Sequence, residues 1–262
     1  MYTTMYGLFA FLIFPQKQSG LFLEYIHSSQ KNATDAYGIT GFEGLTSFYG
    51  FMYHSQKRLL PLIIDKTIQT KGPIVVAITG ASGSVYALTL IRWLAGNGYQ
   101  VDAIASETGK KVFEYETGTK FTVRAITNGK GLLTIHDNNN LFSSLSSGSS
   151  KQGKFSKVVI VPCSMGTLGR IAAASGSKLI ERVADVALKE RRRLVIVPRE
   201  TPLHSLHLKN MLELSSAGAV ILPAMPGFYQ KPGSVNDIIN FMVSKILDAL
   251  DIPNEMYTRW GN

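Results

Sequence analysis

Cysteine is almost absent from this chain: Cys163 is the one cysteine among 262 residues. A single cysteine cannot form an internal disulfide framework, which fits a reducing compartment. The chain also lacks an apolar stretch long enough to span a bilayer, an aspartate-rich diphosphate motif and a cluster of residues at metal-ligand spacing. We therefore expect neither a disulfide-stapled secreted domain nor a membrane protein, and we expect no bound metal.

Negative charge is the minority sign, since 27 Lys and Arg residues stand against 18 Asp and Glu residues, a formal net charge of +9. Basic proteins often bind nucleic acid. Here, however, the basic residues are scattered apart from the run Lys189–Arg193, and no aromatic platform is interleaved with them. We expect no nucleic-acid partner, because a site for phosphorylated small molecules explains the basic balance equally well.

The most informative stretch lies near residue 80. An apolar, β-branched run, Ile74–Ile78, ends in a turn of small residues, Gly80–Ser84, and an apolar-periodic segment follows at 85–94. This pattern is typical of a buried parallel strand, a tight turn and a helix. The amides of such a turn lie at a helix N-terminus, where a phosphate is the natural ligand, and small residues let the backbone approach it closely.

The same pattern recurs along the chain. Further strands are predicted at 101–105, 158–161, 194–197 and 219–222, and helices at 180–191, 204–217 and 235–250. Continuous apolar strands between amphipathic helices indicate a parallel sheet covered on both faces. The predicted fold class is therefore α/β, a Rossmann-like (flavodoxin-like) three-layer sandwich with a parallel sheet, which binds ligands beyond the carboxyl ends of its strands.

Two segments do not share this alternation. Residues 1–72 are rich in Gly, Ser, Tyr and Phe, and we predict an accessory or poorly ordered N-terminal extension before one domain at 73–262. A signal peptide fits poorly, because no Lys or Arg precedes the short apolar run at 7–14. We expect a cytoplasmic protein, or a mitochondrial one if the extension is a presequence. The Ser- and Asn-rich segment 138–154 is predicted to be a flexible loop.

Several short segments, taken together and in order, resemble a known family. They are Thr79–Gly83, Tyr115–Thr117, Pro162–Thr167, Glu181–Arg192, Pro198–Leu203, Pro226–Tyr229 and Arg259–Trp260. Each is weak alone, but the ordered set is specific and runs over most of the chain. On these segments the chain resembles the UbiX-type flavin prenyltransferases from about Pro73 to Trp260, and the residues before Pro73 lie outside the resemblance.

The resemblance implies a reaction. Members of the family transfer a dimethylallyl group from dimethylallyl phosphate to N5 and C6 of reduced FMN, without a metal. The product, prenylated FMN, is the cofactor of UbiD-type decarboxylases, which are thereby implied as recipients. The family forms dodecamers with sites at subunit contacts, so a homo-oligomer is expected. A diphosphate donor and the downstream pathway are left open by the sequence.

The resemblance also implies roles for individual residues. The implied catalytic residues are Glu116, Lys189, Arg199 and Glu200. The implied FMN contacts are Gly80, Ala81, Ser82, Ser106, Ser164, Met165, Gly166, Thr167 and Arg182. The implied contacts of the allyl phosphate are Ser82, Lys189, Arg199, Tyr229, Lys245 and Trp260.

The chemistry needs these residue types. Prenyl transfer from a phosphate ester requires cations that stabilise the departing phosphate, which is the role implied for Lys189, Arg199 and Lys245. Lys245 stands where many family members have Arg, so the charge is kept but the bidentate fork is lost. Glu200 is implied as the group that moves a proton when C6 of the flavin loses its hydrogen.

Two other functions are left open. An FMN-dependent cysteine decarboxylase of the same fold would show a histidine on the first helix, where this chain has Tyr86 and Leu90, and a different turn at Pro162–Met165. A non-catalytic flavin-binding protein would need no cations for a second phosphate beside that of FMN, the role implied for Lys189, Arg199 and Lys245. Cys163 has no His and Asn partners at a recognisable spacing, so we interpret it as a small buried residue and not as a catalytic thiol.

Overall fold

Parallel strands form the centre of the structure, a computed structural model that describes residues 73–129, 132–150 and 154–257. The described strands are β1 (Ile74–Ile78), β2 (Val101–Ala105), β3 (Leu133–Asp137), β4 (Lys157–Cys163), β5 (Arg193–Pro198) and β6 (Val220–Ile221). They form a six-stranded sheet in the order β3-β2-β1-β4-β5-β6, and all the strand pairs are parallel. The predictions for the extension 1–72 and for Trp260 lie outside the described residues.

The strand order explains why both fold names apply. The five strands predicted from the sequence are all present, and among themselves they follow the flavodoxin-like order 2-1-3-4-5. The strand that the prediction missed, β3, adds to the free edge of β2 and extends this order to the Rossmann order 3-2-1-4-5-6. The predicted α/β fold class is confirmed.

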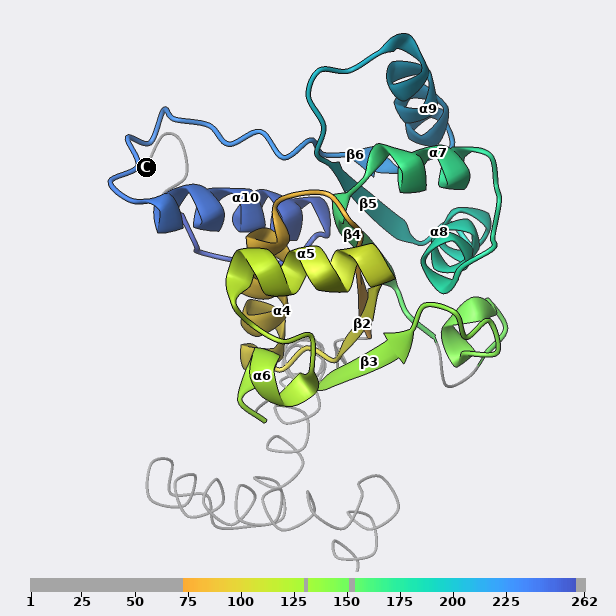
Figure 1. Ribbon diagram of the computed structural model, residues 1–262, viewed down its shortest axis with the longest axis horizontal. Coiled ribbons are helices and arrows are strands. Elements are labelled where there is room, and N and C mark those ends of the chain that lie inside the picture. Colours follow the sequence, from red (N-terminus) through yellow and green to blue (C-terminus); the bar gives the residue numbers. More distant parts are fainter. Residues whose placement is uncertain (1–72, 130–131, 151–153, 258–262) are drawn as a thin grey trace, which may run out of the picture. The chain divides into compact units, whose positions relative to one another are not determined.

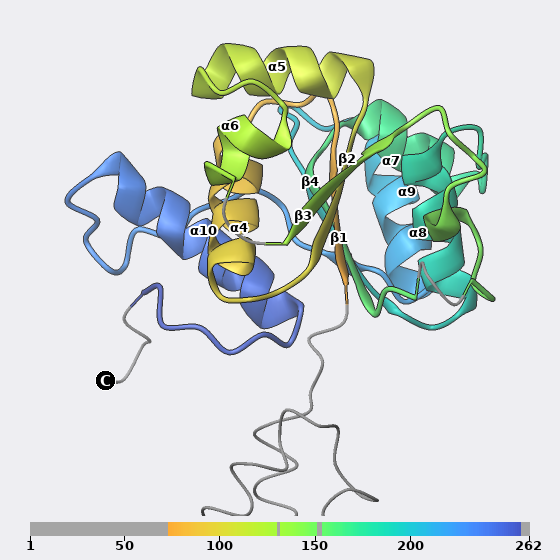
Figure 2. The same cartoon turned by 90° about the horizontal axis from the view of Figure 1, so that it is seen from below.

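Helices cover both faces of the sheet (Figures 1 and 2). The described helices are α4 (Ser84–Gly96), α5 (Glu107–Thr117), α6 (Val123–Thr127), α7 (Met165–Ala172), α8 (Leu179–Lys189), α9 (Ser205–Ser216) and α10 (Val235–Ala249). In Figure 2, α4, α6 and α10 lie on one side of the sheet, α7, α8 and α9 lie on the other, and α5 lies across one end. No helix in this part of the chain is both long and apolar enough to cross a membrane.

Successive side chains of β1 point alternately into two hydrophobic clusters, one on each face of the sheet. Ile74, Val76 and Ile78 belong to the hydrophobic cluster that includes α4 and α10, while Val75 and Ala77 belong to the cluster that includes α7 and α8. All five residues are buried, because a strand of a parallel sheet has helices on both faces. This double burial explains why the strand reads as an unbroken apolar run.

The sheet reverses its winding between β1 and β4, which are neighbours. From β1 the chain crosses to β2 on one side, and from β4 it crosses to β5 on the other, so a crevice opens beyond the carboxyl ends of these two strands. Buried Thr79 ties the two ends together: its hydroxyl donates to the carbonyl of Pro162 at 2.9 Å and accepts from the amide of Ser164 at 2.7 Å. The turns after β1 and β4 are therefore fixed relative to each other.

The Ser- and Asn-rich segment after β3 is a packed connection and not only a loop. It contains a short 3-10 helix, η1 (Ser144–Ser146), and Leu145 within it is buried. Phe155 is also buried, and the guanidinium of Arg192 lies 4.5 Å from the centre of its ring. Two apolar anchors thus hold a stretch whose composition predicted flexibility.

Candidate active site

The turn after β1 binds an anion from its own chain. Gly83 has a φ of +112°, which glycine adopts at little cost. The amides of Gly83 and Ser84 donate to one carboxylate oxygen of Glu116, at 3.0 and 2.8 Å. A helix N-terminus favours negative charge, and the sequence predicted that this charge would belong to a phosphate. In the structure it belongs to Glu116, which stands near the end of α5.

The environment of Glu116 keeps its side chain ionised. Partial burial by itself favours the neutral form, but hydrogen bonds from the Ser82 hydroxyl and from the amides of Ser84 and Gly83 outweigh it, so the pKa of Glu116 lies below its usual range. At neutral pH this carboxylate can fix a positive charge or accept a proton, but it has no proton to give.

Tyr86 is a member of this site that the sequence analysis did not select. A Cβ placed on Gly83 would lie 3.1 Å from the Tyr86 ring, so the ring packs directly on the turn. Burial raises the pKa of Tyr86, the charge of Arg199 lowers it in part and the charge of Glu116 raises it further. Tyr86 thus lies in the electrostatic field of both charged residues. Its position in the first turn of α4, directly after the glycine turn, is the sequence feature that could have marked it as a site residue.

Two predicted FMN contacts, Ser106 and Ser164, begin helices at the carboxyl edge of the sheet. The Ser106 hydroxyl accepts from the amide of Gly109 at 3.0 Å, and the Ser106 amide donates to the carbonyl of Ile78. A Cβ on Gly109 would lie 2.7 Å from that same carbonyl oxygen, so only glycine lets α5 sit on the end of β1. Ser164 caps α7 through the amide of Thr167. The structure therefore brings both serines to the turn after β1.

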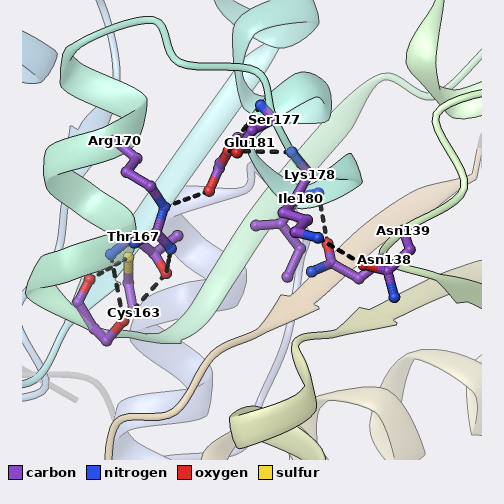
Figure 3. Close-up of polar contacts among 10 residues, drawn as sticks. Asn138, Asn139, Cys163, Thr167, Arg170, Ser177, Lys178, Ile180 and Glu181 are labelled. Atoms are coloured by element: carbon purple, nitrogen blue, oxygen red, sulfur yellow. Dashed lines mark hydrogen bonds and ion pairs between the residues drawn. The ribbon is translucent and has the colours of Figure 1, made fainter.

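A chain of polar contacts supports the turn after β4 (Figure 3). The Ser164 hydroxyl lies 3.1 Å from that of Thr167, which also accepts from Arg170 at 3.1 Å. Arg170 in turn donates to Glu181 of α8 at 2.5 Å. Glu181 is 2% exposed and accepts two further bonds from Ser177 and one from the amide of Lys178. The turn after β4, which carries predicted FMN contacts, is thus held in place by hydrogen bonds that lead to α8.

We expect Glu181→Gln to destabilise the protein by about 1–3 kcal/mol at pH 7, because a buried, fully bonded carboxylate loses its charge and part of its hydrogen bonding. Burial alone would raise the pKa of Glu181, but the bonds from Arg170 and Ser177 lower it overall. A lowered folded-state pKa contributes stability above the unfolded pKa and loses it as the pH falls through the folded value. The difference between wild type and variant should therefore shrink in acid, measured by urea unfolding at fixed protein concentration.

The matched control is Glu107→Gln. Glu107 forms an exposed i,i+3 pair with Lys110 at 2.8 Å, and such surface pairs contribute about 0.5 kcal/mol or less. A loss as small for Glu181→Gln as for this control, or a difference that grows in acid, would contradict the assigned role of the Glu181 network.

A second group of predicted site residues lies on α8. Arg182 and Lys189 are seven residues apart and share one side of the helix, with Asp185 between them. Arg182 donates to Asp185 and, at 2.9 Å, to the carbonyl of Ser146, while Lys189 pairs with Glu190 at 2.9 Å. Both cations are partly exposed. They form a basic stripe on the outer face of α8, beside the serine-rich segment.

Lys189 and Arg199 lie at opposite ends of the strands, Lys189 at the amino end of β5 and Arg199 at its carboxyl end. Lys189 ends α8 and is followed by the turn into β5, whereas Arg199 directly follows the last residue of β5. The six residues of β5 span about 20 Å, and a phosphate oxygen accepts hydrogen bonds only from donors about 3 Å away. The backbones of Lys189 and Arg199 in one chain are therefore separated by about the length of β5. Arg199 and Glu200 are both exposed at the carboxyl edge.

A third group surrounds Phe241 of α10. The ring of Tyr229 meets that of Phe241 edge to face, with centroids 5.7 Å apart, and Tyr257 does so at 5.4 Å. The Lys245 ammonium lies 5.8 Å from the Phe241 centroid and 5.6 Å from that of Tyr257. The structure thus brings together Tyr229 and Lys245, two predicted contacts of the allyl phosphate, in an aromatic and cationic group.

Cys163 is not placed for catalysis. Burial raises the pKa of its thiol to about 12, although the charge of Arg170 lowers it in part. At neutral pH a thiol of this kind is neutral and a weak nucleophile, as the sequence analysis interpreted it. Across the described ranges, no three or more His, Cys, Asp and Glu side chains gather in a way that could hold a metal ion.

Comparison with known proteins places this site in a class. The fold, with polar residues at the switch point between β1 and β4, is that of an α/β flavoprotein, and the Flavoprotein family model matches residues 63–247. The flavin prenyltransferase UbiX of Halalkalibacterium halodurans is 46% identical over 197 residues, which cover 73% of this chain and 94% of that protein. The UbiX of Methanocaldococcus jannaschii is 48% identical over 189 residues, or 72% and 98% of the two chains. The chain belongs to the UbiX flavin prenyltransferase family.

Solved structures agree with this assignment. AnUbiX (PadA1), crystallised with FMN and dimethylallyl pyrophosphate, is 40% identical, has a TM-score of 0.67 and is matched over 73% of this chain and 98% of its own. A dodecameric FMN-dependent UbiX-like decarboxylase from Escherichia coli O157:H7 is 34% identical with a TM-score of 0.66, over 72% of this chain and all of its own.

Proposed function

We propose that the protein transfers a dimethylallyl group from dimethylallyl phosphate to N5 and C6 of reduced FMN, in sites shared between copies of the chain. The observation that carries the shared site is the separation of Lys189 from Arg199 by the full length of β5. The reaction itself is proposed from the family and from the bound FMN and dimethylallyl pyrophosphate of AnUbiX. The prenylated product would serve a UbiD-type decarboxylase.

The residues at the switch point fit a flavin. Gly80, Ala81 and Ser82 follow β1, and Ser164 and Gly166 follow β4, so small side chains line both turns of the crevice. Small residues let a planar ring approach the backbone. The contacts of Thr79 hold the two turns at a fixed separation. Reduced FMN, bound there as the prenyl acceptor, supplies the nucleophilic N5 and C6 atoms.

The clamp for the allyl phosphate is proposed to come from two chains. One chain supplies Arg199 and Glu200 from the end of β5, and a neighbour supplies the basic stripe of α8, with Lys189 and Arg182. Three or more cations around a departing phosphate stabilise the negative charge that develops when the carbon–oxygen bond of the ester breaks. The Tyr229 and Lys245 group adds an aromatic face and a further cation, which suits an allylic cation and its phosphate.

Exposed apolar side chains support an oligomer. Leu206, Leu208 and Leu212 of α9, and Met225 and Phe228 of the following segment, are all exposed in the single chain. Large exposed apolar residues concentrated in neighbouring segments indicate a protein contact. The dodecameric E. coli relative has the same fold, and we propose a homo-oligomer of this type for the present chain.

Two carboxylates are assigned different roles. Glu200 accepts a bond from the amide of Thr201 and is otherwise exposed at the carboxyl edge, so it can exchange a proton with the phosphate or with C6 of the flavin. Glu116, held ionised by the turn after β1, provides a fixed negative charge near Tyr86, which also lies in the field of Arg199. This role is narrower than the catalytic role that the resemblance implied for Glu116.

Incubation with reduced FMN and dimethylallyl phosphate tests the function. We expect a flavin heavier by one five-carbon prenyl unit in the mass spectrum, with release of inorganic phosphate. A parallel reaction with dimethylallyl diphosphate shows which ester is the donor. Because a structural relative from Aquifex aeolicus is named a phenylacrylic acid decarboxylase, a third reaction supplies phenylacrylic acid with oxidised FMN. Release of carbon dioxide without prenylated flavin would overturn the proposal.

A further inference from the structure

Three side chains at the β2–β3 edge of the sheet form a polar relay. Asp102 of β2 is 6% exposed, and its carboxylate lies 2.8 Å from Nε2 of His136 on β3. The other ring nitrogen of His136, Nδ1, lies 3.5 Å from the hydroxyl of Ser143. Because the carboxylate can only accept, Nε2 donates to it, and Nδ1 faces the Ser143 hydroxyl.

The register of the sheet builds this arrangement. His136 is paired with Ile104, two residues beyond Asp102 on β2. Residues two apart on a strand project on the same face, so Asp102 and the His136 ring both lie on the face that α8 covers. The pairing places a buried carboxylate behind the imidazole and leaves the far side of the ring to Ser143.

From Ser143 the relay continues to the basic stripe of α8. The Ser143 hydroxyl accepts from the amide of Leu145 at 3.3 Å, which starts η1, and its carbonyl accepts from the Ser146 hydroxyl at 2.7 Å. The carbonyl of Ser146 then accepts from Arg182. The next residues present more hydroxyls, since those of Ser147 and Ser149 lie 3.0 Å apart. A buried carboxylate in the sheet is thus linked to a partly buried segment of serines beside Arg182.

The composition of the relay resembles a hydrolytic triad, but its geometry does not. A nucleophilic serine needs a free hydroxyl within close reach of its base. The Ser143 hydroxyl is 3.5 Å from His136 and already accepts an amide bond within its own turn. The contacts of Ser143 with Leu145 and Ser146 fix the backbone of η1. We therefore interpret Ser143 as a residue that positions this segment and not as a nucleophile.

We propose that Asp102, His136 and Ser143 position the segment Ser143–Ser149 against Arg182, so that its hydroxyls and the guanidinium together bind a phosphate monoester. Hydroxyl donors and arginine are the groups that recognise such a phosphate. The inference rests on the proposed function, in which the monoester is either the allyl donor or the phosphate of FMN. It assigns a role to three residues to which neither the family resemblance nor the comparisons gave one.

The test compares Ser143→Ala with Ser143→Thr in the full-length protein. Ser143→Ala removes the hydroxyl, and Ser143→Thr restores it. We expect Ser143→Ala to raise, by about tenfold, either the KM for dimethylallyl phosphate or the Kd for FMN, with kcat within about twofold of wild type, and Ser143→Thr to reverse the change. A rise in KM alone identifies the phosphate as that of the donor, and a rise in Kd alone as that of FMN.

A purely structural role gives another pattern. A fall in kcat with KM and Kd unchanged, or no change in any of the three, would overturn the relay. His136→Gln is the second variant, because its amide can still donate to Asp102 while the contact with Ser143 is lost, and it should repeat the Ser143→Ala result. Asn139→Ala is the control from the same connection, since its side chain makes exposed contacts with Lys178 and Asp137 outside the relay. If the wild type transfers no prenyl group, the proposed function fails, while FMN binding still tests the relay.

Discussion

Replacing Arg199 or Lys189 by alanine is expected to lower prenyl transfer on the order of a hundredfold or more, while FMN stays bound. Each change removes a positive charge that is needed as the phosphate departs, and neither residue belongs to the turns after β1 and β4 that are assigned to the flavin. Turnover is measured as prenylated flavin formed under saturating FMN, and flavin binding by quenching of its fluorescence.

Lys178→Ala is the matched control for the clamp. Lys178 precedes the same helix as Lys189 and is also exposed, but its ammonium donates to the side chain of Asn139 at 2.8 Å and has no role in the proposed clamp. This variant should transfer the prenyl group at close to the wild-type rate. Normal turnover in Arg199→Ala or Lys189→Ala would remove that residue from the clamp.

Replacing Glu200 by glutamine is expected to separate the two bond-forming stages. The first stage breaks the carbon–oxygen bond of the ester, joins the allyl carbon to N5 and releases phosphate and the N5 proton. In the second stage the double bond of the prenyl group takes up a proton at one carbon, its other carbon bonds to C6, and the C6 proton must leave. Glutamine keeps the acceptor for the Thr201 amide but cannot take up the proton. Ring closure should slow by about a hundredfold or more, so that an N5-alkylated flavin without the fourth ring accumulates and is seen by its absorbance spectrum.

The clamp variant is the control for this second experiment. Lys189→Ala should accumulate no adduct, because it fails before the first bond forms. Ring closure at the wild-type rate in Glu200→Gln would refute Glu200 as the proton acceptor and leave the departing phosphate or Glu116 in that role.

The central strands could be predicted from the sequence because each is marked by a short run of consecutive apolar residues. A run such as Val75–Ile78 is apolar on both faces, short, β-branched and followed by a glycine turn, which is typical of a covered parallel strand. The edge strand β3 could not be predicted in the same way. Its residues Thr134, His136 and Asp137 are polar, and they are tolerated because the strand is half exposed and because His136 finds its partner on β2. That pairing joins residues 34 apart in the chain.

The contact between Glu116 and the turn after β1 also could not be predicted from the sequence. The pattern of the turn after β1 predicts that its amides bind an anion, but it does not say which one. Glu116 is 32 residues away from Ser84 and reaches it only because Gly109 lets α5 lie on the end of β1. A contact of this kind depends on the packing of a helix, which composition and periodicity do not determine.

The separation of Lys189 from Arg199, in contrast, could have been read from the sequence. A helix that ends at Lys189 and a strand that starts within a few residues place that lysine at the amino edge of the sheet. Arg199 follows the end of the same strand and must lie at the other edge. Family resemblance implies a role for each residue, whereas the order of helix and strand along the chain determines at which end of the sheet each residue lies.

Subunit mixing tests the shared site most directly. Lys189→Ala and Arg199→Ala chains, each nearly inactive alone, are co-expressed with different tags, and the mixed oligomers are isolated. If each site takes Lys189 from one chain and Arg199 from its neighbour, equal random mixing leaves both residues intact in about one quarter of the sites, so about one quarter of the wild-type turnover should return. Mixed oligomers no more active than the parent variants would contradict a clamp shared between chains.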